Sequence, residues 1–137
     1  QDQAEHHRRL LSATAARAVF REVFVSQIEG RPRSRALDQF NALLAAAAAR
    51  LELARGDSGR LERRWIGFAE TVDCILWPVT WFATELLSSS DVDRLRMCGG
   101  RDCGWMYVDR SRNGLRRWCE MSVCGTAEKN RRRAERE

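Results

Sequence analysis

Four of the five cysteines fall within 27 residues near the C-terminus, and this clustering is the strongest constraint on the fold. They form two close pairs with the spacing Cys-x4-Cys-x15-Cys-x4-Cys, at Cys98, Cys103, Cys119 and Cys124. Two such pairs about 15 residues apart are typical of a four-cysteine zinc site in a reducing compartment. Two disulfides are the alternative, and they would need an oxidising compartment for which the sequence carries no address. We therefore expect these thiolates to bind one structural Zn2+.

The amino-acid composition of the whole chain is that of a folded protein. It has 137 residues, of which 44% are hydrophobic and 31% are charged, as expected for about one domain with a small appendage. No uncharged apolar run is long enough to span a membrane, and the first residues lack the apolar stretch of a secretory signal. We expect a soluble, cytoplasmic protein. Because the chain does not begin with Met, we also expect further residues upstream.

Three segments ahead of the cysteine cluster have apolar residues at helical spacing. The first helix is predicted over residues 10–28 and the second from Ser34, as its N-cap, through the alanine run at 45–49. The third is predicted over residues 69–87, with a kink or break at Pro78. Cys74 lies in this third segment and is expected to be a small buried hydrophobe rather than a fifth ligand.

Shorter patterns predict two hairpins. Residues 51–65 surround a Gly-Asp-Ser-Gly turn and favour a β-hairpin, with a helix continuing through Arg55 as the alternative. Between the cysteine pairs, residues 105–108 have strand propensity and Asn113-Gly114 favours a tight turn back through residues 115–118. A helix is expected to start near Cys124.

These elements together predict a mainly α fold in two parts. Residues 1–97 form a helical domain, and residues 98–137 form a small treble-clef-like zinc finger consisting of a hairpin and a C-terminal helix. About 40 residues bury too little apolar surface to fold alone, so zinc is expected to supply much of the stability of the finger.

Positive charge concentrates in the finger. The net charge is +5, but residues 110–133 alone hold eight basic residues against Glu120 and Glu128. Such an excess is a candidate footprint for phosphate, and the alternative is a solvated basic face whose charges pair locally. The candidate DNA contacts are Arg112, Arg116, Arg117, Lys129, Arg131, Arg132 and Arg133.

The residues around the cysteines resemble a known family. The resemblance is carried by Cys98-x4-Cys103-Gly104-Trp105, Val108 to Asn113, Arg116-Arg117-Trp118-Cys119-x-Met121 and Cys124-Gly125. These stretches are similar to the CGNR-type zinc finger, which follows an ABATE-like helical domain in bacterial proteins described as stress-induced transcription regulators. The resemblance implies that the four cysteines are the zinc ligands and that the finger binds DNA. Thr126 and Ala127 depart from the Asn and Arg that give the motif its name.

The leading hypothesis is therefore a zinc-dependent, DNA-binding transcription regulator whose helical domain senses a signal or forms a homodimer. The alternatives are a structural zinc finger that docks a protein partner, and a thiol redox switch. An enzyme is not expected, because four cysteines leave no open position on zinc. The histidines, His6 and His7, lie far from the cluster in sequence and are expected to be exposed.

Overall fold

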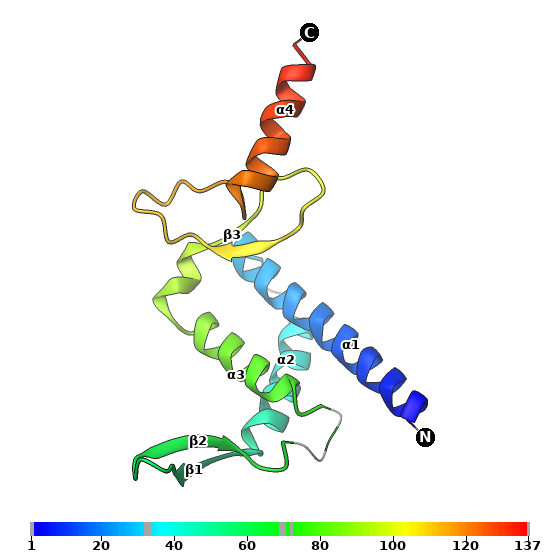
Figure 1. The fold of residues 1–137 in the computed structure, drawn as a ribbon, viewed down its shortest axis with the longest axis vertical. Coiled ribbons are helices and arrows are strands. Elements are labelled where there is room, and N and C mark those ends of the chain that lie inside the picture. The colour runs from blue at the N-terminus through cyan, green and yellow to red at the C-terminus, as the bar shows by residue number, and fades with distance from the viewer. Residues whose placement is uncertain (1, 32–33, 69–70, 72, 137) are drawn as a thin grey trace.

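The protein consists of a helical part and a small finger that projects from one end of it (Figure 1). The computed structural model describes the chain except for residues 1, 32–33, 69–70, 72 and 137. The side chains of His6 and His7 also lie outside the described part, so their expected exposure is not addressed by the structure.

The first two helices confirm the sequence pattern. Helix α1 (Asp2–Glu29) begins earlier than expected, and α2 (Ser34–Ala48) has Ser34 as its first helical residue. Gly30 follows α1 with a φ of 62°, the left-handed conformation that commonly ends a helix. The helices pack around a core cluster of Val23, Ala36 and Phe40, with residues of α1 and α3 against it.

The predicted hairpin over residues 51–65 is present, and the alternative of a continuous helix is wrong. Strand β1 (Leu51–Arg55) pairs antiparallel with β2 (Leu61–Trp65), from Leu51 opposite Trp65 to Arg55 opposite Leu61. The β1–β2 hairpin lies at the end of the molecule opposite the finger (Figure 1).

The third helix is shorter than predicted. Helix α3 (Leu76–Leu87) is preceded by a turn at residues 73–75, so Cys74 lies half-buried in this turn and not in the helix. Pro78 is the third residue of α3, where the backbone N–H that proline lacks has no intrahelical partner in any case. Proline therefore sits in the first turn of this helix, which is continuous from Leu76 to Leu87.

A 3-10 turn, η1 (Ser90–Arg94), connects α3 to the finger. Its N-cap is Ser89, whose hydroxyl accepts a hydrogen bond from the Asp91 N–H.

The strand pairing within the finger differs from the prediction. Strand β3 (Leu95–Met97) pairs antiparallel with β4 (Met106–Val108), so the hairpin encloses the first cysteine pair. Residues 115–118 form no strand. Their backbone is held otherwise: the Tyr107 hydroxyl donates to the Arg116 carbonyl at 2.6 Å, and the Arg116 N–H donates to Asp109. The expected domain boundary at residue 97 consequently cuts this hairpin, because residues 95–97 are paired with the finger.

The helix predicted near Cys124 is present. A π-helical turn, η2 (Met121–Gly125), leads directly into α4 (Thr126–Ala134). The fold is thus mainly helical with two small antiparallel hairpins, as the sequence indicates. None of the helices in the described residues has the length and apolarity needed to cross a membrane.

Candidate metal centre and nucleic-acid interface

The four clustered cysteines meet at one point of the finger. Cys98 and Cys103 come from the β3–β4 loop, Cys119 precedes η2, and Cys124 lies in its last turn. Their four Sγ atoms lie within 4.8 Å of one another, and Cys119 Sγ is 3.5 Å from Cys103 Sγ and 3.6 Å from Cys124 Sγ. Tetrahedral zinc with Zn–S bonds near 2.3 Å requires sulfur–sulfur separations of roughly 3.8 Å. The donor set therefore fits zinc, and all four cysteines are free of disulfides.

The pKa values of Cys98 and Cys124 are shifted in opposite directions by their neighbours. Burial opposes ionisation of Cys98, but the backbone N–H groups of Cys119 and Gly100 donate to its sulfur and lower its pKa to about 7. In contrast, the neighbouring thiols of Cys103 and Cys119 raise the pKa of Cys124 to about 12. Four adjacent thiolates repel one another, so a divalent cation is the natural means of holding all of them ionised.

Gly125, the residue after Cys124, packs closely against the side chains of Trp118 and Met121. A Cβ atom at Gly125 would lie 3.1 Å from Cδ1 of Trp118 and would also collide with the Met121 sulfur. A side chain at this position would therefore require Trp118 and Met121 to shift. Trp118 is half-buried there, whereas Trp105 is 70% exposed.

Sequence reasoning missed Asp109, which organises the loop between the cysteine pairs. Its carboxylate is fully buried and accepts hydrogen bonds from the N–H and hydroxyl of Ser111 and from the N–H of Arg116. The hydrogen bond from the Ser111 hydroxyl is the main reason that the pKa of Asp109 lies below its ordinary value. The signal in the sequence is the Asp-x-Ser spacing, which is common where aspartate caps a turn.

Replacing Asp109 with asparagine should loosen this loop. The amide offers one acceptor oxygen, so at least one buried N–H loses its partner. We expect the melting temperature of the zinc-loaded protein to fall by about 5 °C or more, measured by circular dichroism. The exposed Asp102, also in the finger, provides the matched control, and Asp102→Asn should leave the melting temperature unchanged. Equal melting temperatures for the two variants would contradict this role of Asp109.

The basic residues expected to contact DNA fall into two groups. Arg116 is used within the finger: its guanidinium donates to the carbonyls of Trp118 and Cys119 and lies 4.8 Å from the Tyr107 ring centre. Arg131 and Arg132 both pair with Glu128. These hydrogen bonds, Arg131 first, lower the pKa of Glu128 to about 2, so the carboxylate holds both guanidinium groups at neutral pH.

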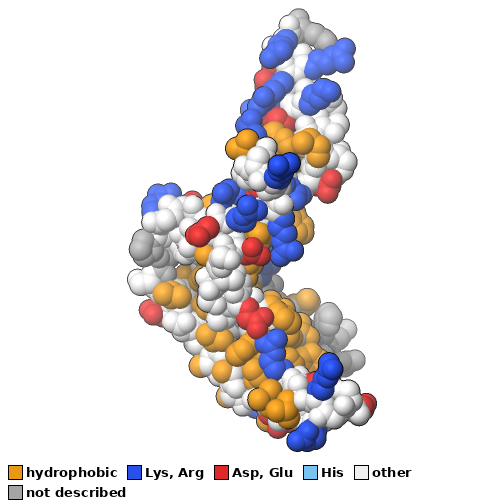
Figure 2. Space-filling view, turned by 90° about the vertical axis from the view of Figure 1, so that its left-hand side faces the viewer, with side chains coloured by type: hydrophobic (Ala, Val, Ile, Leu, Met, Phe, Trp, Pro, Cys, Tyr) orange, Lys and Arg blue, Asp and Glu red, His pale blue; other side chains and the backbone are white. Residues whose placement is uncertain are grey.

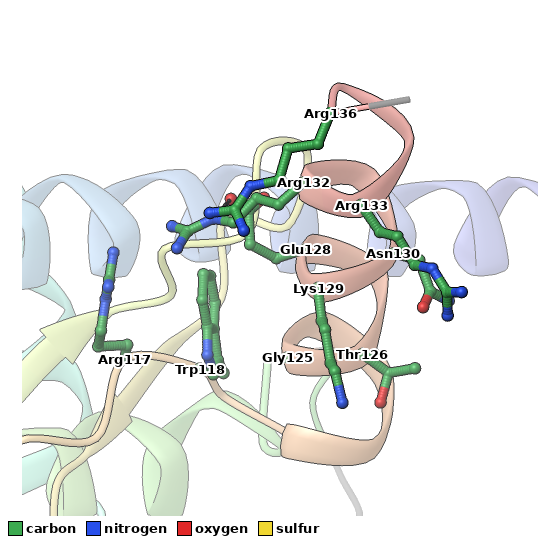
Figure 3. Close-up of a pocket in the computed structure, with 10 residues that line it drawn as sticks. All are labelled: Arg117, Trp118, Gly125, Thr126, Glu128, Lys129, Asn130, Arg132, Arg133 and Arg136. Carbon is green, nitrogen blue, oxygen red and sulfur yellow. Dashed lines mark hydrogen bonds and ion pairs between the residues drawn. The ribbon is translucent and has the colours of Figure 1, made fainter.

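A second set of cations lines an open groove beside α4. The groove has a volume of about 770 Å3 and lies between α4 and the loop at residues 117–118. Figure 3 shows Arg132 of α4 and Arg136, just after its end, extending toward the side on which Arg117 and Trp118 lie, with Arg133 and Asn130 on the other side of the helix. The residues that line the groove are Arg117, Trp118, Gly125, Thr126, Glu128, Lys129, Asn130, Arg132, Arg133 and Arg136. Arg112 lies outside this set, exposed in the turn at residues 111–114.

Arg136 is the groove residue that the sequence reasoning omitted. It follows Lys129 and Arg132 at helical spacing of three and four, which is the available signal. The Arg117 guanidinium lies 5.3 Å from the Trp118 ring centre, so a cation and an indole stand together at the opposite wall. Figure 2 shows Lys and Arg side chains along the projecting α4. The groove is therefore strongly cationic, with Glu128 as its single acidic lining residue.

Comparison with known families is consistent with both parts of the structure. The ABATE profile, described as "Putative stress-induced transcription regulator", matches residues 1–90. The chain belongs to the ABATE family. A second profile, for the CGNR zinc finger, matches residues 94–137, which include the β3–β4 hairpin, the four cysteines and α4. No curated protein matches the sequence.

The ABATE domain and the CGNR finger are in direct contact. The Arg21 guanidinium of α1 donates to the Gly104 carbonyl of the finger at 2.9 Å. Gly104 has a φ of 62° in the loop that carries Cys103, so the contact reaches the residue next to a zinc-site cysteine. In the ABATE domain, Trp77 is buried in the core, while Trp81 donates from its indole N–H to Glu85 at 2.8 Å.

Proposed function

We propose that this ABATE-family chain is a DNA-binding transcription regulator and that one structural zinc ion, bound by the four cysteines, holds its finger in shape. The observation that carries the proposal is the groove beside α4, which combines several cations with one indole face. Zinc supplies only a fixed cross-link here, because four thiolates fill its coordination shell. We accordingly propose no catalytic role.

The groove has the chemistry to bind the DNA backbone. Lys129 and Arg136 make no ion pair with another described residue, so their charges are available to phosphate. Arg117 can contact a second stretch of backbone from the opposite wall, as finger proteins do when loop and helix flank one strand. Arg131 and Arg132, tied to Glu128, contribute positive potential more than direct contact. Arg133 also lines the groove. The proposed phosphate contacts are Arg117, Lys129, Arg133 and Arg136.

The test is retention of duplex DNA by the zinc-loaded protein as a function of salt. Four neutralised phosphates give a slope of log K against log salt of roughly −4. The double variant Lys129→Ala/Arg136→Ala removes two contacts and should make the slope shallower by about 2. The matched control, Arg35→Ala/Arg60→Ala, removes the same charge from exposed positions in the ABATE domain and should leave the slope nearly unchanged.

Stoichiometric zinc with no salt-dependent retention would contradict the proposal and favour a finger that docks a protein partner. Equal loss of DNA affinity in both double variants would mean that binding depends on net charge alone and not on the groove. Homodimerisation through the ABATE domain stays a prediction, which sedimentation velocity of the purified chain would check.

A further inference from the structure

A second groove lies between α1 and the finger, and the proposed function does not use it. It has a volume of about 820 Å3, which is within the range of small-molecule binding sites. Figure 1 shows the C-terminal half of α1 reaching the level of β3, where the ABATE domain meets the finger. The residues that line it from α1 include Arg17, Phe20, Arg21 and Phe24, and residues 103–106 line it from the finger.

One component of this groove is aromatic. Phe20 and Phe24 are one helical turn apart on α1, and Trp105 faces the same groove from the finger. Trp105 is 70% exposed, which is unusual for the largest apolar side chain. An indole left in solvent beside two phenyl rings offers a face on which a flat apolar group can stack.

The other component is positive charge. Arg17 and Arg21 are four residues apart on α1, and the lining residues include no Asp or Glu. Arg21 uses one N–H on the Gly104 carbonyl and keeps further donors, while Arg17 forms no ion pair with a described residue. Two guanidinium groups without a carboxylate partner favour an anion, and a carboxylate matches their planar geometry.

We propose that this groove binds a small aromatic carboxylate, whose anionic group pairs with Arg17 and Arg21 and whose ring packs against Phe24 and Trp105. Such a ligand would touch both domains at once. It would also lie beside Cys103 and the Arg21–Gly104 hydrogen bond, so its binding would act directly on the loop that carries the first cysteine pair. The site does not depend on the proposed DNA groove, because the two grooves share no lining residue.

The probe for this site is 2-naphthoate, titrated into the zinc-loaded full chain by calorimetry and by NMR of the backbone amides. We expect one site per chain, with amide shifts concentrated in residues 14–24 and 103–106. The neutral 2-naphthamide has the same ring system and should bind at least tenfold more weakly. Arg17→Gln and Trp105→Leu should each weaken naphthoate binding by about tenfold. Arg35→Gln and Phe82→Leu alter an exposed cation and an exposed ring elsewhere, and both should bind as the parent does.

Three results would overturn the proposal. They are no binding at millimolar naphthoate, equal binding of the acid and the amide, and loss of binding in Phe82→Leu with retention in Arg17→Gln. Zinc content and melting temperature are measured for every variant. Because Arg17 is exposed on a helix and makes no ion pair with the described residues, its variant keeps the test decisive even where Trp105→Leu loses zinc.

Discussion

Replacing Cys119 with serine is expected to unfold the CGNR finger while the three helices of the ABATE domain stay folded. Cys119 Sγ contacts the sulfurs of Cys103 and Cys124, and its backbone N–H donates to Cys98 at 3.3 Å, so this residue joins both cysteine pairs. From residue 94 onward the described part has only four buried residues, Leu95, Cys98, Asp109 and Gly125. With so little buried apolar surface, we expect the fold of the finger to depend on the metal, whose binding contributes about 10–16 kcal/mol in small zinc fingers.

The measurement is the backbone NMR spectrum of the variant together with its zinc content. Signals of residues 95–134 should collapse to the narrow range of an unfolded chain, and bound zinc should fall well below one per chain. Cys74→Ser is the matched control, because Cys74 lies outside the cluster, and it should keep both zinc and spectrum. A dispersed finger spectrum in Cys119→Ser, or in the chelated parent, would show that the finger folds without its metal.

Sequence patterns predicted the parts of this structure that local chemistry determines. The spacing of Cys98, Cys103, Cys119 and Cys124 was sufficient to predict that their sulfurs meet, because a four-thiolate site needs two short loops. The first two helices followed from their apolar periodicity and from Gly30. In each case the signal lies within one segment, so no knowledge of the tertiary contacts was needed.

The errors arose where distant residues compete for the same partner. Strand β3 has three residues, which is too short for a periodic pattern, so the pairing of Leu95 with Val108 could not be read from the sequence. The Asn113-Gly114 signal favoured a different pairing, but the carboxylate of Asp109 takes the Arg116 N–H that such a hairpin would have used. The buried Asp109 side chain thus holds this backbone in place of a pairing strand. Burial of an aspartate is rarely expected from sequence.

Counting basic residues also could not show which of the candidate DNA contacts have partners within the chain. Arg131 and Arg132 stand three and four residues after Glu128, a spacing at which ion pairs form on a helix. That spacing was visible in the sequence, and it indicates that two of the seven candidates, Arg131 and Arg132, already have an ion-pair partner. Arg116 could not be removed in the same way, because its partners are backbone carbonyls brought close only by the fold.

Replacing Phe40 with alanine is expected to destabilise the ABATE domain by about 3–5 kcal/mol, as large-to-small changes of buried aromatic residues do. Phe40 is 3% exposed, and its ring packs edge-on against Phe20 with 5.8 Å between ring centres. It joins α2 to α1 at the core cluster, with Ala83 and Leu87 of α3 also packed there. Since domains of this size are stable by about 5–15 kcal/mol, this loss is a large share of the total and should lower the melting temperature of the helical part by more than about 10 °C.

Thermal unfolding followed by circular dichroism measures this effect, and Phe82→Ala is the matched control because Phe82 is 61% exposed on α3. The zinc content of Phe40→Ala then tests how the two parts depend on each other. All four proposed sulfur ligands lie between residues 98 and 124, and the described hydrogen bond to α1 is the one from Arg21 to Gly104. The finger should therefore keep its zinc when the helices unfold. Loss of zinc at the same temperature as helix unfolding would mean that contact with α1 is required to assemble the cysteine cluster.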